Sequence, residues 1–537
     1  MQGLHHGRRP DHGGIRAYCV RGGIASLAAA AFMIREADVP GHVITILEAE
    51  DRLGGSLDGA GDPERGYVIR GGRMLEAEFR CTFDLFSSIP TLARDRTVTE
   101  EILAWNRVIR SQSKARLVRA GRRLDTPAFG LAERHILTLE RLGLEPEGML
   151  GRSSIADHFE ASFFETNFWL MWCTTFAFQP WHSAVEFRRY LLRFMHLIGG
   201  FSRLEGILRT RYNQYDSLVR PLQAWLAERG VRVEHRTRVT DLEFAEAGQA
   251  RRIAAILCEG PGGPRRIEVG AEDRVLVTLG SMTDASSFGD TDHAPAPRER
   301  TEGAAWRLWE RIADGRPEFG RPVVFDRHVP DSRWVSFTAT LRDPALFRMV
   351  RDFTGNVPGE GGLITFAESG WLLSIVLPHQ PHFADQPEEV QVLWGYGLKV
   401  DRPGDAVAKP MLACTGREIM QEVLAQLGLG GEAAERILAT TTCIPCLMPF
   451  ITSQFLCRGP GDRPAVRPEG AANFAFLGQF CELPEDVVFT VEYSVRSAWT
   501  AVQALFGAGR VPPPVHQGRF DPRVLWRAFR TLHDLEG

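Results

Sequence analysis

The sequence lacks long apolar runs and long runs of one charge. No stretch of about 18 uninterrupted apolar residues occurs, so no membrane-spanning helix is predicted. The 63 Lys and Arg residues nearly balance the 67 Asp and Glu residues, and the formal net charge is −4. Because phosphate neutralisation needs a concentrated basic face, we expect no nucleic-acid partner.

Cysteine is sparse, and the nine cysteines are scattered over 537 residues. Their odd number argues against a disulfide framework and favours a reducing, cytoplasmic location. Cys443 and Cys446 form one C-x-x-C pair, but no second pair stands at zinc-finger spacing. We therefore interpret them as core thiols and predict no metal site. Residues 1–15 lack the apolar core of a secretory signal, and we interpret them as a flexible lead-in.

A strand, a helix and a second strand are predicted between residues 16 and 48. The first strand ends near Val20, an alanine-rich helix follows, and the run HVITILE alternates β-branched residues like a buried parallel strand. The connection YCVRGGIASL (18–27) approximates the G-x-G-x-x-G/A turn of dinucleotide-binding proteins. Such a turn directs the free N–H groups of a helix N-terminus at a pyrophosphate.

This turn is irregular because Arg21 stands in place of the first glycine. If the position requires a positive φ, arginine is disfavoured there, and we expect Gly22 to supply the positive φ instead. Gly23 permits close approach of the pyrophosphate, and Ser26 is small enough for helix–strand packing. Glu48, at the end of the second strand, is spaced to bind a ribose hydroxyl.

Further glycine-rich segments strengthen the prediction of a nucleotide site. The turn RLGGSLDG (52–59) favours FAD over NAD, and the arginines of IRGGRMLEAEFRC (69–81) can reach an anion or a flavin carbonyl. The strand EDRVLVTLGSM (272–282) is expected to rejoin the same sheet, and a helix is predicted to begin at or just before Glu492. The cofactor contacts expected in these segments are Gly54, Gly55, Ser56, Arg70, Gly71, Gly72, Arg73, Gly280, Ser281, Phe489 and Thr490.

An aromatic-rich stretch at 163–196 admits two interpretations. A buried helix pair, broken near Gln179 and Pro180, would use its Phe and Trp residues for packing. A long apolar substrate pocket would need the same residue types, so both interpretations stay open.

Together these patterns predict an α/β fold with a Rossmann-like FAD-binding lobe, an inserted α+β substrate lobe and a helical C-terminal segment. The FAD-binding lobe is discontinuous and takes residues 16–75, 205–290 and 430–506. The substrate-binding lobe takes residues 76–204 and 291–429.

The tail, residues 507–537, is predicted to contain an amphipathic helix with three arginines near its apolar side. Such a helix can lie on an anionic membrane surface or dock on the body of the protein, and both interpretations stay open. Its apolar side consists of Val524, Leu525, Phe529, Leu532 and Leu535.

Several longer strings belong to a recognisable pattern: RGGR at 70–73, TTFAFQPWHSAVEF at 174–187, RYNQYDSL at 211–218, HQPHF at 379–383, WGYGL at 394–398, KPMLACTGREI at 409–419 and GQFCELPEDVVFTVEYSVR at 478–496. They resemble the oleate hydratase family, also known as the myosin-cross-reactive antigens, from about Ala17 to Phe506. The resemblance implies an FAD-binding enzyme that adds water across the cis-9 double bond of oleic acid and gives 10-hydroxystearic acid without net redox change.

The resemblance also implies catalytic roles, with one departure from the family pattern. The proton donor should be Tyr190, in the string RRYLLRF. The family's usual RGGRE string ends on a glutamate, the proposed base, whereas Met74 stands here and a thioether cannot accept a proton at neutral pH. If a helix follows Arg73, Met74 and Glu78 share one face, so Glu78 is the expected substitute and Glu76 the second candidate.

A second departure affects the end of the site that should bind the substrate carboxylate. The family commonly shows T-x-N-x-x-x-H around the HQPHF string, whereas Val376 and Pro378 stand here and only His382 remains. Valine and proline side chains offer no hydrogen-bond donor, so we expect looser head-group binding. His379, Gln380 and Trp181 are the further substrate contacts that we predict.

Other functions remain compatible with these patterns. An FAD-dependent oxidoreductase or double-bond isomerase acting on a lipid or isoprenoid would use the same glycine turns, and a lipid-binding protein without catalysis would keep the fold. A monomer and a homodimer are equally compatible with the sequence.

Overall fold

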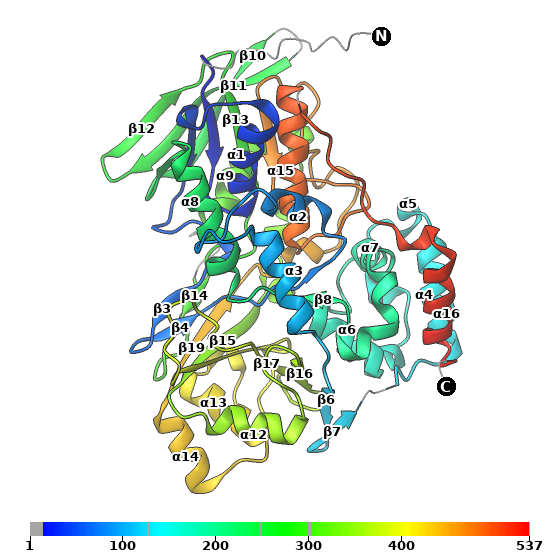
Figure 1. Cartoon of the computed structure of the whole chain (residues 1–537). Coiled ribbons are helices and arrows are strands. Elements are labelled where there is room, and N and C mark those ends of the chain that lie inside the picture. The colour runs from blue at the N-terminus through cyan, green and yellow to red at the C-terminus, as the bar shows by residue number, and fades with distance from the viewer. Residues whose placement is uncertain (1–13, 126–127, 248–249, 299–302, 508, 536–537) are drawn as a thin grey trace.

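The computed structural model has mixed α/β architecture, as predicted (Figure 1). One sheet with its helices lies at the top of Figure 1, a second sheet lies below it, and a group of helices lies at the right. Most of the expected lead-in falls outside the residues that the structure describes. Those residues are 14–125, 128–247, 250–298, 303–507 and 509–535.

The upper sheet is a five-stranded parallel sheet of the nucleotide-binding type. The predicted strand–helix–strand unit is confirmed as β1, α1 (Ile24–Ala37) and β2, and the strand expected at 272–282 rejoins this sheet as β13. Because every pairing is parallel, the carboxyl ends of the strands meet at one edge, where the glycine turns lie. In spatial order the strands are β20 (Phe474–Leu477), β13 (Arg274–Thr278), β1 (Ala17–Val20), β2 (Ile44–Leu47) and β9 (Arg232–Glu234).

Helix α1 packs closely against α15 (Val491–Phe506), beside which it runs in Figure 1. The alanines of α1 are fully buried, and their small side chains allow the two helices to approach. Phe32 of α1 stacks on Trp499 of α15 with ring centroids 4.7 Å apart. The start of α15 confirms the helix predicted near Glu492, so two segments far apart in sequence form one wall of this lobe.

The lower lobe contains an eight-stranded, mainly antiparallel sheet, which is capped by α12 (Ala345–Thr354), α13 (Gly416–Gln426) and α14 (Gly431–Ala439). Strand β19 falls within residues 430–506, the range expected in the FAD-binding lobe, yet it pairs with β15 in this sheet. In spatial order the strands are β14 (Ser287–Phe288), β19 (Thr441–Met448), β15 (Trp334–Leu341), β18 (Gln391–Gly397), β17 (Leu373–Leu377), β16 (Gly362–Phe366), β6 (Ala115–Arg119) and β7 (Arg122–Asp125).

Shorter elements connect the lobes and decorate them. A three-stranded antiparallel sheet projects beside the upper lobe and consists of β10 (Arg238–Ala247), β11 (Ala250–Gly260) and β12 (Gly263–Glu268). The paired short strands are β3 (Ala60–Asp62) with β4 (Gly66–Val68), and β5 (Leu75–Glu76) with β8 (Ile207–Leu208). The remaining connecting helices are α2 (Arg80–Phe86), α3 (Val98–Val108), α8 (Arg220–Glu228), α9 (Ala304–Ala313), α10 (Val323–Asp326) and α11 (Val329–Ser332).

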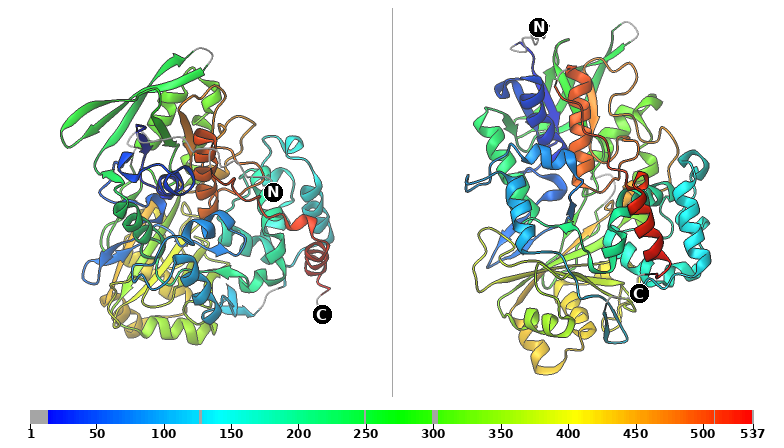
Figure 2. Two further views of the ribbon diagram at one scale, coloured as in Figure 1. Left: turned by 45° about the horizontal axis from the view of Figure 1, so that its top comes forward. Right: turned by 45° about the vertical axis from the view of Figure 1, so that its right-hand side comes forward.

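A helical group contains the aromatic-rich stretch and the C-terminal tail (Figure 2). The predicted buried helix pair is confirmed as α6 (Asn167–Phe176) and α7 (Ala184–Phe194), and the chain between them includes Gln179 and Pro180. Beside them lie α4 (Glu133–Leu144), α5 (Glu147–Leu150) and, from the far end of the chain, α16 (Pro522–Leu532). Among the described residues, no helix is long and apolar enough to span a membrane.

Candidate functional site

The glycine turns converge on one cavity of about 490 Å³ at the carboxyl edge of the parallel sheet. The residues predicted from several separate segments therefore come together in space. Those that line the cavity are Gly23, Glu48, Gly54, Gly55, Ser56, Arg70, Gly280 and Ser281. Ser26 lies behind them, where its hydroxyl is 3.0 Å from that of Thr278, so it joins α1 to β13 as the packing argument predicted.

The first turn differs from expectation in which residue has the positive φ. Arg21 itself adopts φ 81°, so the expectation that Gly22 supplies this angle is wrong. Gly22 is required for space instead, because a Cβ there would lie 2.2 Å from Leu53 Cδ2 and 2.9 Å from Glu48 Oε2. The Gly22 N–H donates to Glu48 Oε2 at 2.5 Å, and the Glu50 N–H donates to Glu48 Oε1 at 2.8 Å. Glu48 thus shapes the turn and retains further acceptor sites toward the cavity.

The cavity fits a dinucleotide at the N-terminus of α1. Gly23 is the N-cap residue and provides no side-chain cap, so the first N–H groups of α1 are available to a ligand. A Cβ built on Gly23 would meet no atom within 4 Å, which leaves open space where a pyrophosphate would lie. Gly54 and Gly55 adopt φ 111° and 56°, which suit glycine, and bring the second turn against the first.

A second, small cavity of about 70 Å³ lies between β5, α6, α7 and the start of α15. Its walls are mostly apolar, with Phe176, Phe194 and Phe489 among them. The predicted residues that line it are Gly72, Arg73, Met74, Glu76, Tyr190, Phe489 and Thr490. We refer to this space as the reaction cavity, because it brings the expected proton donor together with one candidate base.

Tyr190 is buried in an aromatic environment within the reaction cavity. Its hydroxyl donates to the Val488 carbonyl oxygen at 2.5 Å, and the rings of Phe176 and Phe178 both lie 5.0 Å from its ring. Burial raises the pKa of Tyr190 well above 10, and the negative charges of Glu186 and Asp486 add to that shift. The phenol is therefore protonated at pH 7.

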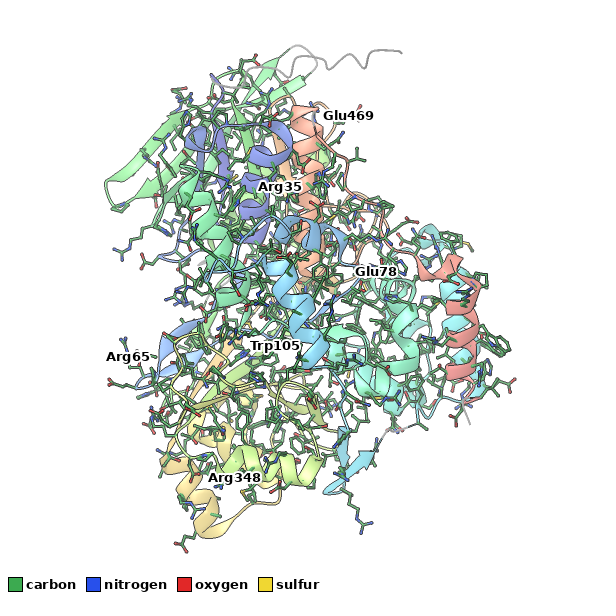
Figure 3. The ribbon with its side chains drawn as sticks, viewed as in Figure 1. Arg35, Arg65, Glu78, Trp105, Arg348 and Glu469 are labelled. Atoms are coloured by element: carbon green, nitrogen blue, oxygen red, sulfur yellow. The ribbon has the colours of Figure 1, made fainter. Side chains whose placement is uncertain are left out.

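Glu78 does not reach the reaction cavity, because the helix after Arg73 on which its role depended does not form. Residues Leu75–Glu76 form the short strand β5, and α2 begins only at Arg80, so Met74 and Glu78 share no helical face. Glu78, labelled in Figure 3, pairs with Arg80 at 2.7 Å and with His516 at 3.4 Å. This correction leaves Glu76 as the acid on the cavity wall.

Glu76 is almost completely buried and has two basic neighbours. Its Oε1 lies 2.7 Å from Arg193 Nη1, and its Oε2 lies 3.4 Å from His196 Nε2. Burial favours a raised pKa, but hydrogen bonding to His196 and the charge of Arg193 outweigh it, so the pKa of Glu76 is lowered. The carboxylate therefore stays ionised beside an apolar cavity.

A third space, an arginine-lined pocket of about 50 Å³, adjoins the reaction cavity and shares Gly72 and Arg73 with it. Both predicted histidines line this pocket, as do Val376 and Pro378 where the family pattern has hydrogen-bond donors. Burial lowers the pKa of His382 to about 4, so this ring is neutral at pH 7. His379 lies edge-on to Trp105, which is labelled in Figure 3, with ring centroids 4.7 Å apart.

Three arginines line this pocket and were not predicted as a group: Arg73, Arg209 and Arg211. Within the described residues, no Asp or Glu lines the pocket, and the Nε and Nη2 atoms of Arg209 are buried without a hydrogen-bond partner. Burial lowers the pKa values of Arg73 and Arg209 to about 10, so both still carry charge at pH 7. The closely spaced arginines just before the YNQYDSL string were the signal that sequence reasoning missed.

Two predicted substrate contacts lie outside these cavities. Gln380 braces its own loop, since its amide donates to the carbonyl oxygens of Pro378 at 3.1 Å and Val392 at 2.9 Å. Trp181 is half exposed and donates to the Asp331 carbonyl oxygen at 2.9 Å. It lines a separate, largely apolar cavity of about 400 Å³, which also borders α6.

Comparison with known proteins identifies the family. The model of the MCRA family matches residues 15–503. The chain belongs to the MCRA family. Among its relatives, an oleate hydratase of Streptococcus pyogenes serotype M49 (strain NZ131) is 37% identical over 529 residues, which cover 96% of this chain and 90% of that protein. A linoleate hydratase of Lactiplantibacillus plantarum is 30% identical over 566 residues, which cover 97% of this chain and 98% of that protein.

Solved structures show that this MCRA chain shares its fold with two oxidases. Cyclohexylamine oxidase from Brevibacterium oxydans IH-35A has a TM-score of 0.53 and 14% identity, covering 92% of this chain and 99% of the oxidase. Putrescine oxidase bound to putrescine has a TM-score of 0.52 and 13% identity, covering 91% of this chain and 98% of that oxidase. At this level of identity the likeness establishes the fold alone.

Proposed function

We propose that this protein is an FAD-dependent hydratase that adds water across an isolated cis double bond of an unsaturated fatty acid, as in the conversion of oleate to 10-hydroxystearate. The observation that carries the proposal is the meeting of Tyr190 and Glu76 on the wall of one apolar cavity. The hydratase names of the relatives and the dinucleotide cavity support it.

The two side chains divide the chemistry of hydration. The Tyr190 hydroxyl gives its proton to one alkene carbon, so a C–H bond forms and positive charge develops at the other carbon. Water attacks that carbon, and Glu76 accepts the proton that the water loses as the C–O bond forms. Exchange of one proton with solvent resets both groups, so the net change is the addition of one water without redox change.

The surroundings compensate for the weak acidity of a phenol. The negative charge of Glu76 and the faces of nearby aromatic rings stabilise the developing carbocation. The positive charge of Arg73 lowers the pKa of Tyr190, against the effects of burial and the nearby acids, and thus stabilises the phenolate left behind. Apolar walls exclude bulk water that would otherwise screen these charges.

FAD, when bound in the cavity at the carboxyl edge of the parallel sheet, would help to organise the site without any net redox change. Its pyrophosphate would be held by the N-terminus of α1 and the second glycine turn. Gly71 and Gly72 place no side chain next to the reaction cavity. A Cβ on Gly71 would lie 2.8 Å from Arg73 Nη1. Arg73 lies over the Phe489 ring at 5.1 Å and thereby joins the cofactor side of the site to the substrate side.

The substrate carboxylate would bind in the arginine-lined pocket. Buried guanidinium groups without acidic partners favour an anion, and arginine can bind a carboxylate with two hydrogen bonds. The pocket adjoins the reaction cavity and shares Gly72 and Arg73 with it, which suits a chain that extends from its carboxylate to its double bond. We therefore assign the free acid as the substrate form, in preference to an alcohol or ester.

Peripheral membrane contact is a further part of the proposal. Helix α16 exposes Leu525, Trp526 and Phe529, and α4 and α5 beside it expose Leu144 and Met149. His533, just after α16, pairs with Glu140 of α4 at 3.5 Å, so the end of α16 lies next to α4. Exposed apolar side chains with arginines near them suit docking on an anionic membrane surface from which a fatty acid could enter.

The decisive experiment is product analysis in heavy-oxygen water. Purified protein with FAD is incubated with oleate, linoleate and oleyl alcohol, and the products are analysed by mass spectrometry with and without an electron acceptor. We expect a hydroxy acid with one heavy oxygen, formed without any acceptor. An oxidised product that requires the acceptor would support the oxidoreductase alternative instead, and an isomerised product without heavy oxygen would support the isomerase alternative.

A further inference from the structure

Arg21, the first residue of the glycine turn, adopts a backbone conformation that arginine rarely occupies. Its φ of 81° lies in the left-handed region, where glycine is the usual residue. Three hydrogen bonds hold the turn in place. The Arg21 N–H donates to the Leu47 carbonyl oxygen at 2.8 Å, the Gly22 N–H donates to Glu48 at 2.5 Å, and the Gly54 N–H donates to the Gly22 carbonyl oxygen at 2.9 Å. Residues held in this way cluster where a protein clamps a ligand.

The side chain of Arg21 lines the dinucleotide cavity next to Gly23, the N-cap residue of α1. Its Nε is buried and, within the described part of the chain, has no hydrogen-bond partner. A buried guanidinium N–H without an acceptor is costly unless a ligand or water supplies one.

Four of the five acids that line the same cavity, all except Glu50, are already engaged by other groups. Asp58 pairs with Arg70 at 3.0 Å, Asp51 pairs with Arg236, and Asp284 accepts the Ala305 N–H at 2.7 Å. Glu48 accepts the two backbone N–H groups of its turn. Arg21 therefore lines a space with room for an anion, while the carboxylates of Glu48, Asp51, Asp58 and Asp284 serve the protein's own framework.

We propose that Arg21 binds the pyrophosphate of FAD and adds a full positive charge to the partial charge at the N-terminus of α1. This inference rests on the FAD binding proposed above. The first turn of α1 contains no basic residue, so the helix end offers only its partial positive charge to a phosphate. Arg21, on the preceding turn, adds a full positive charge beside it. The guanidinium suits phosphate oxygens in charge and in geometry. Arginine in place of the usual glycine thus binds the cofactor directly, and this binding offsets the unfavourable backbone angle.

Titration of the full chain, freed of flavin, with FAD and with riboflavin tests this inference. Riboflavin lacks the pyrophosphate, so the positive charge of Arg21 should strengthen the binding of FAD but not that of riboflavin. For Arg21→Gln we expect FAD affinity to fall roughly 10- to 100-fold and its salt dependence to weaken, while riboflavin affinity stays within about twofold. Arg21→Lys should recover part of the loss, and Arg65→Gln, at the exposed Arg65 labelled in Figure 3, is the matched control.

The variant Arg21→Gly separates charge from backbone strain. Glycine relieves the unfavourable φ, so unchanged or tighter FAD binding would overturn the inference and leave Arg21 as a strained turn residue. Equal losses for FAD and riboflavin would also overturn it, because they would indicate a damaged turn. Failure of the unaltered chain to bind FAD would overturn the cofactor proposal itself, and this outcome is distinguishable from the other two.

Discussion

The carboxylate of Glu76 lies 2.7 Å from the guanidinium of Arg193, and the exposed fractions of the two side chains are only 2% and 1%. The two residues come from β5 and α7, so this ion pair connects the candidate base to the helix that contains the proposed proton donor, Tyr190. A buried pair of this kind keeps the acid ionised and fixes its position next to the reaction cavity.

Replacement of Glu76 should reduce turnover far more than replacement of Glu78. For Glu76→Gln we expect the rate of oleate hydration to fall roughly 10²- to 10⁴-fold, because the water loses its general base. Glu78→Gln is the matched control and should stay within about threefold, since Glu78 pairs with Arg80 outside the cavity. Rates are compared at equal FAD occupancy, measured from the flavin spectrum. The reverse ranking of the two variants would exclude Glu76 as the base.

The stability of the protein should depend on pH through Glu186 of helix α7. Its buried carboxylate contacts Arg458 and Arg463, each at 2.9 Å. Burial opposes ionisation, but the charges of Arg463 and Arg458 prevail and lower the pKa of Glu186 from 4.5 to about 2. The folded-state pKa is thus depressed, so the stabilisation is present above about pH 4.5 and is lost as the pH falls toward 2.

This dependence can be measured by denaturant unfolding of Glu186→Gln and the unaltered chain between pH 7 and pH 3. At pH 7 we expect the variant to lose about 3–5 kcal/mol of unfolding free energy, because the buried Arg463 and Arg458 both lose the carboxylate of Glu186, while Arg458 keeps its pairing with Glu482. The difference in unfolding free energy between the variant and the unaltered chain should become smaller below pH 4.5. A difference that stays constant down to pH 3 would show that the carboxylate of Glu186 does not contribute in this way.

Arg209 should select for a carboxylate head group. For Arg209→Gln we expect the apparent affinity for oleate to fall roughly 10- to 100-fold, since the buried anion loses a charged donor. Oleyl alcohol, which has no charge, should be affected little. Arg348→Gln, at the surface position labelled in Figure 3, is the control. Stearate has the same carboxylate but no double bond to hydrate, so its binding to Arg209→Gln and to the unaltered chain compares the affinities without turnover. Equal losses for acid and alcohol would argue against a carboxylate contact.

The exposed face of α16 should determine membrane binding. Trp526 is 61% exposed, so Trp526→Glu should lower co-flotation with anionic vesicles roughly tenfold while FAD content is unchanged. Val108→Glu provides a matched control, because Val108 is 75% exposed but lies on α3. Equal flotation of both variants and the unaltered chain would show that the exposed side chains of α16 do not bind the membrane.

Local patterns allowed prediction of much of the nucleotide-binding lobe. The strand HVITILE, the glycine turns and the start of α15 follow from residues close together in sequence, and the structure has them where expected. Arg21 and Gly22 show the limit of such reasoning. Crowding by Leu53 and Glu48 reserves the second position for glycine, so the positive φ falls on arginine.

The candidate catalytic site depends on contacts that no local pattern contains. Leu75 pairs with Leu208 of β8, and this pairing holds the chain after Arg73 as a strand where a helix was expected. The partner that keeps Glu76 ionised, Arg193, belongs to a distant helix of the chain. Arg209 becomes a candidate only from the structure, which shows that, among the described residues, no Asp or Glu lines its pocket. These features arise from tertiary packing. The spacing of residues along the chain does not decide between candidates such as Glu76 and Glu78.

The most direct test of the central claim is the amount of heavy-oxygen-labelled hydroxy acid formed from oleate by Tyr190→Phe and by the unaltered chain. We predict labelled product from the unaltered chain and a loss of roughly 10²-fold or more in the variant, with FAD and stearate binding retained. Tyr67→Phe, at a buried tyrosine that does not line the reaction cavity, should keep its activity. Labelled product at the normal rate from Tyr190→Phe would contradict the account.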